Sequence, residues 1–120
     1  MGKAKLHTPQ EVEVHYILPA VRKALAQQLK DRGLSQKEIA RVLNVTEPAV
    51  SQYINAKRGN VAFNDVIQEA VKLASQNLTT HTELMAHTQS LLKVIKEQGI
   101  TCTLCKEITS APPACRACFE

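Results

Sequence analysis

Apolar residues recur at three- and four-residue spacing over most of the chain, which is the spacing of one face of an α-helix. The pattern is clear over residues 64–76, where the stripe contains Val66, Ile67, Ala70, Val71 and Ala74. A later stripe over residues 80–98 contains Leu84, Leu91, Leu92 and Ile95. The two stripes predict amphipathic helices, the first capped by Asn64 and the second, which a Thr80–Glu83 capping box opens, ended by Gly99. The later stripe suits either the core or a dimer interface.

The first third of the chain predicts two more helices. Thr8 and Glu11 have the spacing of a capping box, with Pro at the first helical position between them, so a helix is expected over about 9–18. β-branched residues are frequent there, which leaves a strand as the alternative. A proline inside a helix removes a hydrogen bond, so Pro19 is expected to open a separate helix over about 19–32, closed by Gly33.

Residues 36–55, QKEIARVLNVTEPAVSQYIN, have the pattern of a helix-turn-helix. Ser35 begins a second capping box, and Asn44 suits the turn because Asn tolerates the left-handed conformation. Thr46 can cap the second helix. Ala40 is small enough for a close helix crossing, and the residues expected to point inward are Ile39, Leu43, Val45, Val50 and Tyr53 or Ile54. The alternative is a pair of ordinary amphipathic helices.

The outward face of the second helix is polar or small, as an element that enters the major groove of DNA requires. The candidate DNA-binding residues are Thr46, Glu47, Pro48, Ser51, Gln52 and Asn55, with Lys57 and Arg58 just beyond the helix. Gln52 is the best candidate for a base contact, because an amide pairs bidentately with adenine. Lys57 and Arg58 suit phosphate neutralisation.

The run LSQKEIARVLNVTEPAVSQYINAKRG resembles the helix-turn-helix of the XRE (Cro/phage-repressor) superfamily. Extended upstream through EVEVHYILPAVRKALAQQL, the chain is similar to small archaeal predicted transcriptional regulators. The resemblance covers roughly residues 8–95. It implies sequence-specific binding to double-stranded DNA, usually as a homodimer on a palindrome, without enzymatic activity. Glu47 and Pro48 depart from the family pattern, so the resemblance does not define the operator.

Residues 100–120 show no clear helical periodicity, but they contain all four cysteines of the chain. Cys102 with Cys105, and Cys115 with Cys118, form two Cys-x-x-Cys pairs that together supply a four-thiolate shell. The short spacer and the apolar surroundings favour an iron–sulfur cluster over zinc, although both remain open. Two disulfides or a redox thiol switch are the alternatives.

The two halves of the chain differ in net charge. Residues 1–60 hold ten Lys and Arg against five Asp and Glu (net +5), and residues 61–120 hold five against six (net −1), which returns the total of +4. A basic first half suits a nucleic-acid-binding module, although a solvated basic face would look the same. Apolar runs are far shorter than the ~20 residues of a membrane span. We therefore expect a cytoplasmic protein with reduced cysteines. No small-molecule substrate is evident from the sequence.

Together these patterns predict an all-α protein with a five- to six-helix helix-turn-helix domain and a small C-terminal four-cysteine metal-binding segment. The expected division is a DNA-binding domain over 8–78, a helix for possible dimerisation over 79–99, and the cysteine tail over 100–120. The predicted function is a non-enzymatic transcriptional regulator whose metal centre senses iron, sulfide or redox state. One alternative is an adaptor with structural zinc that docks on the transcription machinery, and another is a thiol–disulfide enzyme.

Overall fold

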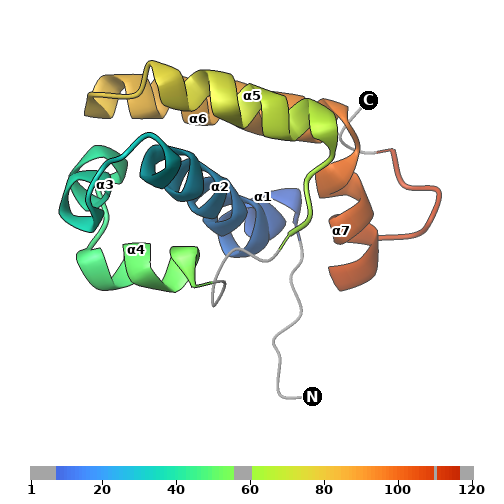
Figure 1. Ribbon diagram of the computed structural model, residues 1–120. Helices are drawn as coiled ribbons and strands as arrows, with labels where there is room; N and C mark the ends of the chain where they lie inside the picture. Colours follow the sequence, from blue (N-terminus) through green and yellow to red (C-terminus); the bar gives the residue numbers. More distant parts are fainter. Residues whose placement is uncertain (1–7, 56–60, 110, 117–120) are drawn as a thin grey trace.

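The computed structural model describes residues 8–55, 61–109 and 111–116 of the chain. Over these residues the fold is all-α, as predicted (Figure 1). The elements are α1 (Pro9–Val12), the π-helix η1 (Glu13–Ile17), α2 (Leu18–Asp31), α3 (Gln36–Leu43), α4 (Glu47–Ile54), α5 (Asp65–Gln76), α6 (His81–Glu97) and α7 (Ile100–Ile108). None of the helices in the described part is long and apolar enough to cross a membrane.

The first three elements form one uninterrupted helical segment. The strand alternative for residues 9–18 is therefore wrong. The helix expected over about 19–32 is present as α2, but it continues from η1 without a break. In η1 the Leu18 N–H donates to the Glu13 carbonyl, five residues back, which is the wider π-type bond. Pro19 is the second residue of α2, so its missing N–H falls where the bonding pattern changes from π to α.

The predicted helix boundaries at caps are confirmed. Thr8, Ser35 and Thr80 each form a complete capping box, and Thr46 and Asn64 each accept a backbone N–H of their own helix. Gly33 and Gly99 adopt positive φ angles of 96° and 78° at helix junctions, where only glycine avoids strain. Local side-chain chemistry therefore sets most of the helix limits.

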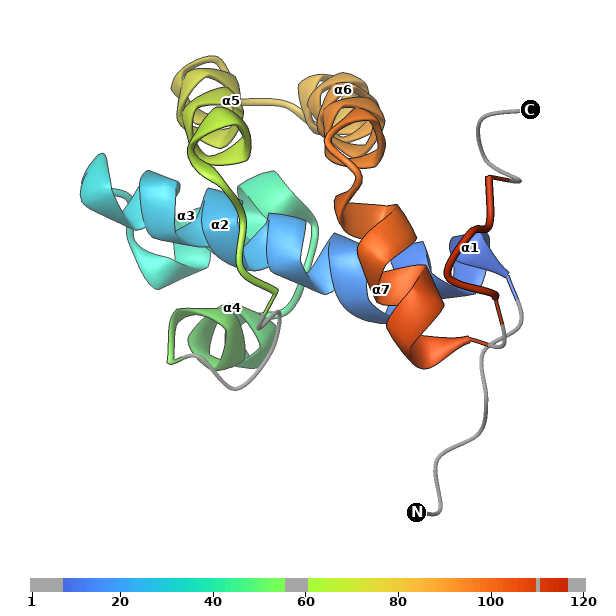
Figure 2. The same ribbon diagram turned by 90° about the vertical axis from the view of Figure 1, so that its right-hand side faces the viewer.

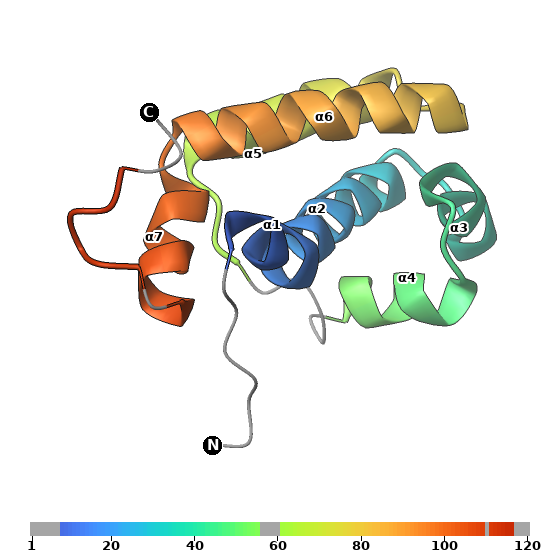
Figure 3. The same ribbon diagram turned by 180° about the vertical axis from the view of Figure 1, so that it is seen from behind.

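The helices form layers around α2. Helices α5 and α6 lie side by side on one side of α2, and α4 lies on the opposite side (Figures 1 and 2). Helix α3 joins α2 to α4, and α7 lies at the other end of α2 against α1 and α6 (Figure 3). The buried core combines residues from all of these elements, among them Val12, Ile17, Leu25, Leu29, Ile39, Val50, Ile67, Val71, Leu91, Ile95 and Cys105.

The apolar stripe of α6 packs largely inward. Leu91 and Ile95 are buried in the core, and Leu84 and Leu92 are half-buried against it. Met85 instead exposes 57% of its surface. The core interpretation of Leu91 and Ile95 is therefore confirmed.

Helix α7 is the main correction to the expected fold. Residues 100–108 form a helix, whereas no helical periodicity was recognised there. The signal is present in the half-buried Ile100, Leu104 and Ile108, which recur every four residues, with the buried Cys105 on the adjoining flank. The cysteines and threonines between these apolar positions make their helical spacing hard to recognise in the sequence.

Candidate DNA-binding site

Helices α3 and α4 meet at a fixed angle over a turn at Asn44. Asn44 has a φ of 56°, and the Val45 N–H donates to the Ala40 carbonyl at 3.0 Å, closing the end of α3. Ala40 is buried at the crossing, as expected from its size. The residues predicted to point inward divide into the buried Ile39, Leu43, Val50 and Tyr53 and the half-buried Val45 and Ile54.

A side-chain bridge also joins the starts of the two helices. The Gln36 Nε2 donates to the backbone carbonyl of Glu47 at 2.9 Å. This bond holds the first turn of α4 against the first turn of α3, so it helps to fix how α4 projects from the protein. Sequence reasoning used Gln36 only as the first residue of a helix and did not identify this contact, because the two residues are eleven positions apart.

Six of the eight predicted DNA-binding residues lie on α4 or at its caps. Thr46, Glu47, Pro48 and Asn55 are exposed, and Ser51 and Gln52 are half-buried. We call this set the α4 face. Lys57 and Arg58, the predicted phosphate contacts, lie outside the described residues.

Three of these side chains already form intramolecular hydrogen bonds. The Thr46 Oγ1 accepts the Ala49 N–H at 3.2 Å and so caps α4. The Asn55 Nδ2 donates to the Ser51 Oγ at 3.2 Å, one helical turn away. Unlike Thr46, Ser51 and Asn55, Gln52 has no side-chain hydrogen bond to another described residue, so its donors and acceptor can face a base edge.

The pKa of Glu38, the carboxylate of the α3 capping box, is lowered from its ordinary value. Hydrogen bonds from the backbone and the side chain of Ser35 lower the pKa of Glu38, and the positive charge of Arg41 lowers it further. Glu38 therefore stays ionised at neutral pH, and its charge lies at the positive N-terminal end of α3.

Helix α7, which contains Cys102 and Cys105, lies at the opposite end of α2 from α3 (Figures 1 and 3). Cys102 and Cys105 are three residues apart on α7 and so share one side of the helix. Cys102 and Cys115 are half-buried, Cys105 is 8% exposed, and these three thiols form no disulfide with one another.

Within residues 8–55, 61–109 and 111–116, no three His, Cys, Asp or Glu side chains lie close enough together to hold a metal ion. Cys118, the fourth predicted ligand, lies outside the described residues, so the four-cysteine site stays a prediction. The chemistry of the four side chains suits a thiophilic metal, since each can supply one thiolate.

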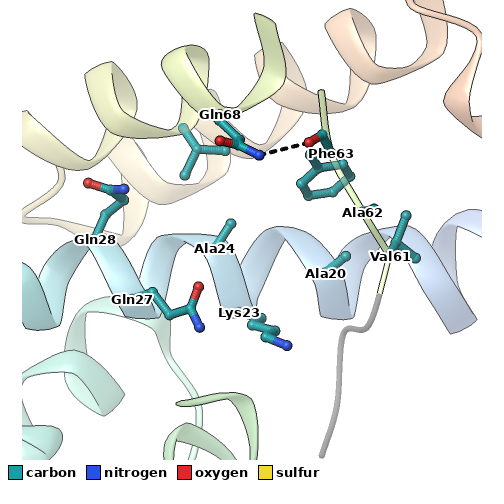
Figure 4. Close-up of a pocket in the computed structure, with 10 residues that line it drawn as sticks. Ala20, Lys23, Ala24, Gln27, Gln28, Val61, Ala62, Phe63 and Gln68 are labelled. Carbon is teal, nitrogen blue, oxygen red and sulfur yellow. Dashed lines mark hydrogen bonds between the residues drawn. The ribbon is translucent and has the colours of Figure 1, made fainter. Parts of the chain in front are cut away.

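A groove of about 560 Å³ lies between α2, α5 and residues 61–63 (Figure 4). The alanines Ala20 and Ala24 line it on α2, and the Gln68 Nε2 donates to the Phe63 carbonyl at 2.8 Å beside it. Its described polar lining consists of Lys23 and amides, without a carboxylate, imidazole or thiol. These described residues therefore offer no pair of groups for acid–base or nucleophilic chemistry.

The comparison with known families agrees with this geometry. The family described as Helix-turn-helix matches residues 25–62, which include the second half of α2 and all of α3 and α4. No curated protein and no solved structure shows significant similarity to the chain. The match supports a helix-turn-helix of the XRE type, and with it a DNA-binding regulator, a class of domain that is not enzymatic. The archaeal resemblance and the cysteine tail remain predictions.

Proposed function

We propose that the chain is a sequence-specific transcriptional regulator that binds double-stranded DNA as a homodimer through the α4 face. The observation that carries the proposal is the projecting helix α4, whose buried side is locked to α3 and whose outward side is short and polar. An α-helix of this kind fits the major groove, which is about 12 Å wide. The helix-turn-helix match over residues 25–62 supports the DNA-binding part of this proposal.

The residues of the α4 face divide by chemistry. Gln52 would read a base edge, because its free amide can both donate to and accept from adenine. Thr46, Ser51 and Asn55 would contact phosphates or bases, and Lys57 and Arg58 would neutralise phosphates. Glu47 carries a negative charge, which repels phosphate but accepts from the amino group of cytosine. Glu47 and the rigid Pro48 would therefore restrict the sequences that α4 tolerates.

A Gln52→Ala substitution tests this assignment. Selection from a random duplex library should yield a defined site for the wild-type protein and a relaxed preference for the variant at one or two positions. Affinity for the best site should fall by about 1–3 kcal/mol, while non-specific affinity changes little. Gln89→Ala on α6 is the matched control, since Gln89 is an exposed helical glutamine away from the α4 face. If Gln52→Ala and Gln89→Ala give the same preference as wild type, Gln52 does not read a base.

We further propose that Cys102, Cys105, Cys115 and Cys118 bind an iron–sulfur cluster, or alternatively zinc, whose state regulates DNA binding. Two Cys-x-x-Cys pairs supply the four thiolates that either centre requires. Protein purified without oxygen should contain iron and sulfide in proportion to protein, or one zinc ion in their place. Equal DNA affinity with and without the metal would make the centre structural and remove the sensor role.

The homodimer follows from how such domains bind palindromic sites. Two copies of α4 would enter successive major grooves about 34 Å apart, matching the half-sites of the operator. Sedimentation of the full chain with duplex DNA should give a complex whose mass is that of the duplex plus two copies of the chain. One copy for each full site would contradict the dimer, while leaving DNA binding intact.

A further inference from the structure

A second groove, of about 560 Å³, lies where α7 meets η1 and the segment that leads into α5. Tyr16 lines it from η1, Val61 and Ala62 line it from that segment, and α7 supplies most of the remaining wall. Val61 and Ala62 also border the groove in Figure 4, so the two grooves share this segment. The volume is within the range of pockets that hold small molecules, about 300–1,000 Å³. We call this site the α7 groove.

The wall that α7 gives to the groove is a stripe of apolar side chains. Ile100, Leu104 and Ile108 are half-buried and recur every four residues, so they lie one helical turn apart on one face. Val61 is half-buried beside the same groove. Covering partly exposed apolar side chains with an apolar ligand removes their surface from water, which is favourable. The lining therefore suits the aliphatic or aromatic part of a ligand.

One charged side chain accompanies this apolar lining. Glu107 is the only Lys, Arg, His, Asp or Glu among the described residues that line the α7 groove, and it forms no ion pair with another described residue. Its carboxylate attracts a cation and repels an anion, although the whole chain has a net charge of +4. A metal ion would need several such ligands, and the described part of the chain has no group of three. The cation that fits the groove is therefore an organic one.

Tyr16 is an independent indication that the groove is a binding site. It is half-buried on η1, where the Leu18 N–H bonds to the Glu13 carbonyl in the wider π-type pattern. Turns of this type within helices occur frequently at functional sites. The Tyr16 hydroxyl has no hydrogen bond to another described residue, so its oxygen can accept one from a ligand. The aromatic ring adds an attraction for a cation.

We propose that the α7 groove binds a small amphiphilic amine. The ammonium group would lie beside Glu107 and Tyr16, and the apolar part of the ligand would cover the apolar stripe of α7. The proposal goes beyond DNA recognition and involves none of the cysteines. Because the segment shared by the two grooves follows α4 and precedes α5 in the chain, the amine would also contact the connection to the recognition helix.

Three probes with the same eight-carbon chain test the proposal: n-octylamine, which is protonated at neutral pH, octan-1-ol and octanoate. Titration of the isotope-labelled full chain under reducing conditions, followed by nuclear magnetic resonance, measures both the affinity and the location of each probe. Octylamine should bind most tightly and shift the amides of residues 61–62 and 100–108. Glu107→Gln should weaken octylamine binding about fivefold and leave octanol binding unchanged. Glu69→Gln is the matched control and should bind octylamine as wild type does, because Glu69 is an exposed helical glutamate outside the lining of the groove.

Several results would overturn the proposal. No binding of octylamine, or equal affinities for the three probes, would mean that the groove does not recognise an ammonium group. Tightest binding of octanoate would mean that the net positive charge of the chain decides the preference. Unchanged octylamine affinity in Glu107→Gln would remove the carboxylate from the site. Shifts centred on the groove of about 310 Å³ between α5 and α6, whose described lining has no carboxylate, would place the amine elsewhere.

Discussion

Two short helices at opposite ends of α2 are held in place by different means. Helix α3 has a complete capping box at Ser35, a left-handed residue at its end, and a side-chain bridge from Gln36 to α4. Helix α7 has no N-terminal side-chain cap, and its buried Thr101 hydroxyl has no hydrogen-bond partner in the described part of the chain. The two helices are similar in length, at eight and nine residues, so length does not explain the difference.

The difference is that α3 has a side-chain cap in addition to its packing, whereas α7 packs without one. The capping contacts of α3 come from residues close in sequence, and they add to the packing of its buried residues Ile39, Ala40, Val42 and Leu43. Helix α7 depends on packing against α1 and α6, and packing can be lost when one buried group changes its chemistry.

The largest contrast should come from truncating one apolar side chain in each helix. Ile39→Ala in α3 removes a side chain that is 1% exposed, and it should lower the free energy of unfolding by about 3 kcal/mol. Leu104→Ala in α7 removes a half-buried side chain and should cost about 1 kcal/mol. Urea denaturation followed by circular dichroism measures both. A larger cost for Leu104→Ala would reverse the comparison.

The turn between α3 and α4 should be sensitive to backbone strain. Asn44 has a φ of 56°, so Asn44→Val places a β-branched residue in the left-handed region and should cost about 1–2 kcal/mol. Asn44→Gly, which suits that conformation, is the matched control and should lie within about 0.5 kcal/mol of wild type. Equal stabilities for the two variants in thermal denaturation would mean that the turn relaxes.

A polar side chain in α7 should be dispensable for folding. Thr101→Val removes the unpartnered hydroxyl and should stabilise the metal-free protein by about 1 kcal/mol, visible as slower amide exchange in α7. Thr103→Val, at an exposed position whose hydroxyl donates to the Gly99 carbonyl at 2.9 Å, should instead be neutral or slightly destabilising. Destabilisation by Thr101→Val would show that its hydroxyl has a partner in solution.

The smallest expected effect is a loss of stability in the first turn of α6 at low pH. Hydrogen bonds from Thr79, through its side chain and backbone, and from the Thr80 backbone lower the pKa of Glu83 from 4.5 to about 2. A depressed pKa means that the ionised carboxylate stabilises the folded state above pH 4.5, and that this contribution declines as the pH falls towards 2. The first turn of α6 should therefore lose amide protection over that range. Glu83→Gln, which keeps the cap but does not titrate, should lose the dependence on pH.

The sequence predicted the helix-turn-helix closely because its determinants are local. The caps at Ser35, Thr46 and Thr80 and the turn at Asn44 depend on residues three or four positions apart, so spacing reveals them. The continuous helix through Pro19 was missed because the π-turn before it depends on tertiary context. Helix α7 was missed because its apolar positions are mixed with cysteines.

The candidate site was predictable only in part. The α4 face follows from helical periodicity once α4 is placed. The Gln36 bridge to Glu47 and the burial of Cys105 depend on contacts between separate elements, which no local pattern contains. The sequence pattern also does not show which side chains of α4 bond within the protein, as those of Thr46, Ser51 and Asn55 do.

The most direct test of the account is a titration of the isotope-labelled full chain with duplex DNA carrying its selected site, followed by nuclear magnetic resonance. The account predicts that the largest amide and side-chain shifts fall on Thr46, Glu47, Ser51, Gln52 and Asn55, with small shifts in α5 and α6. Shifts centred on α5, α6 or α7, with the α4 face unchanged, would contradict DNA recognition by α4.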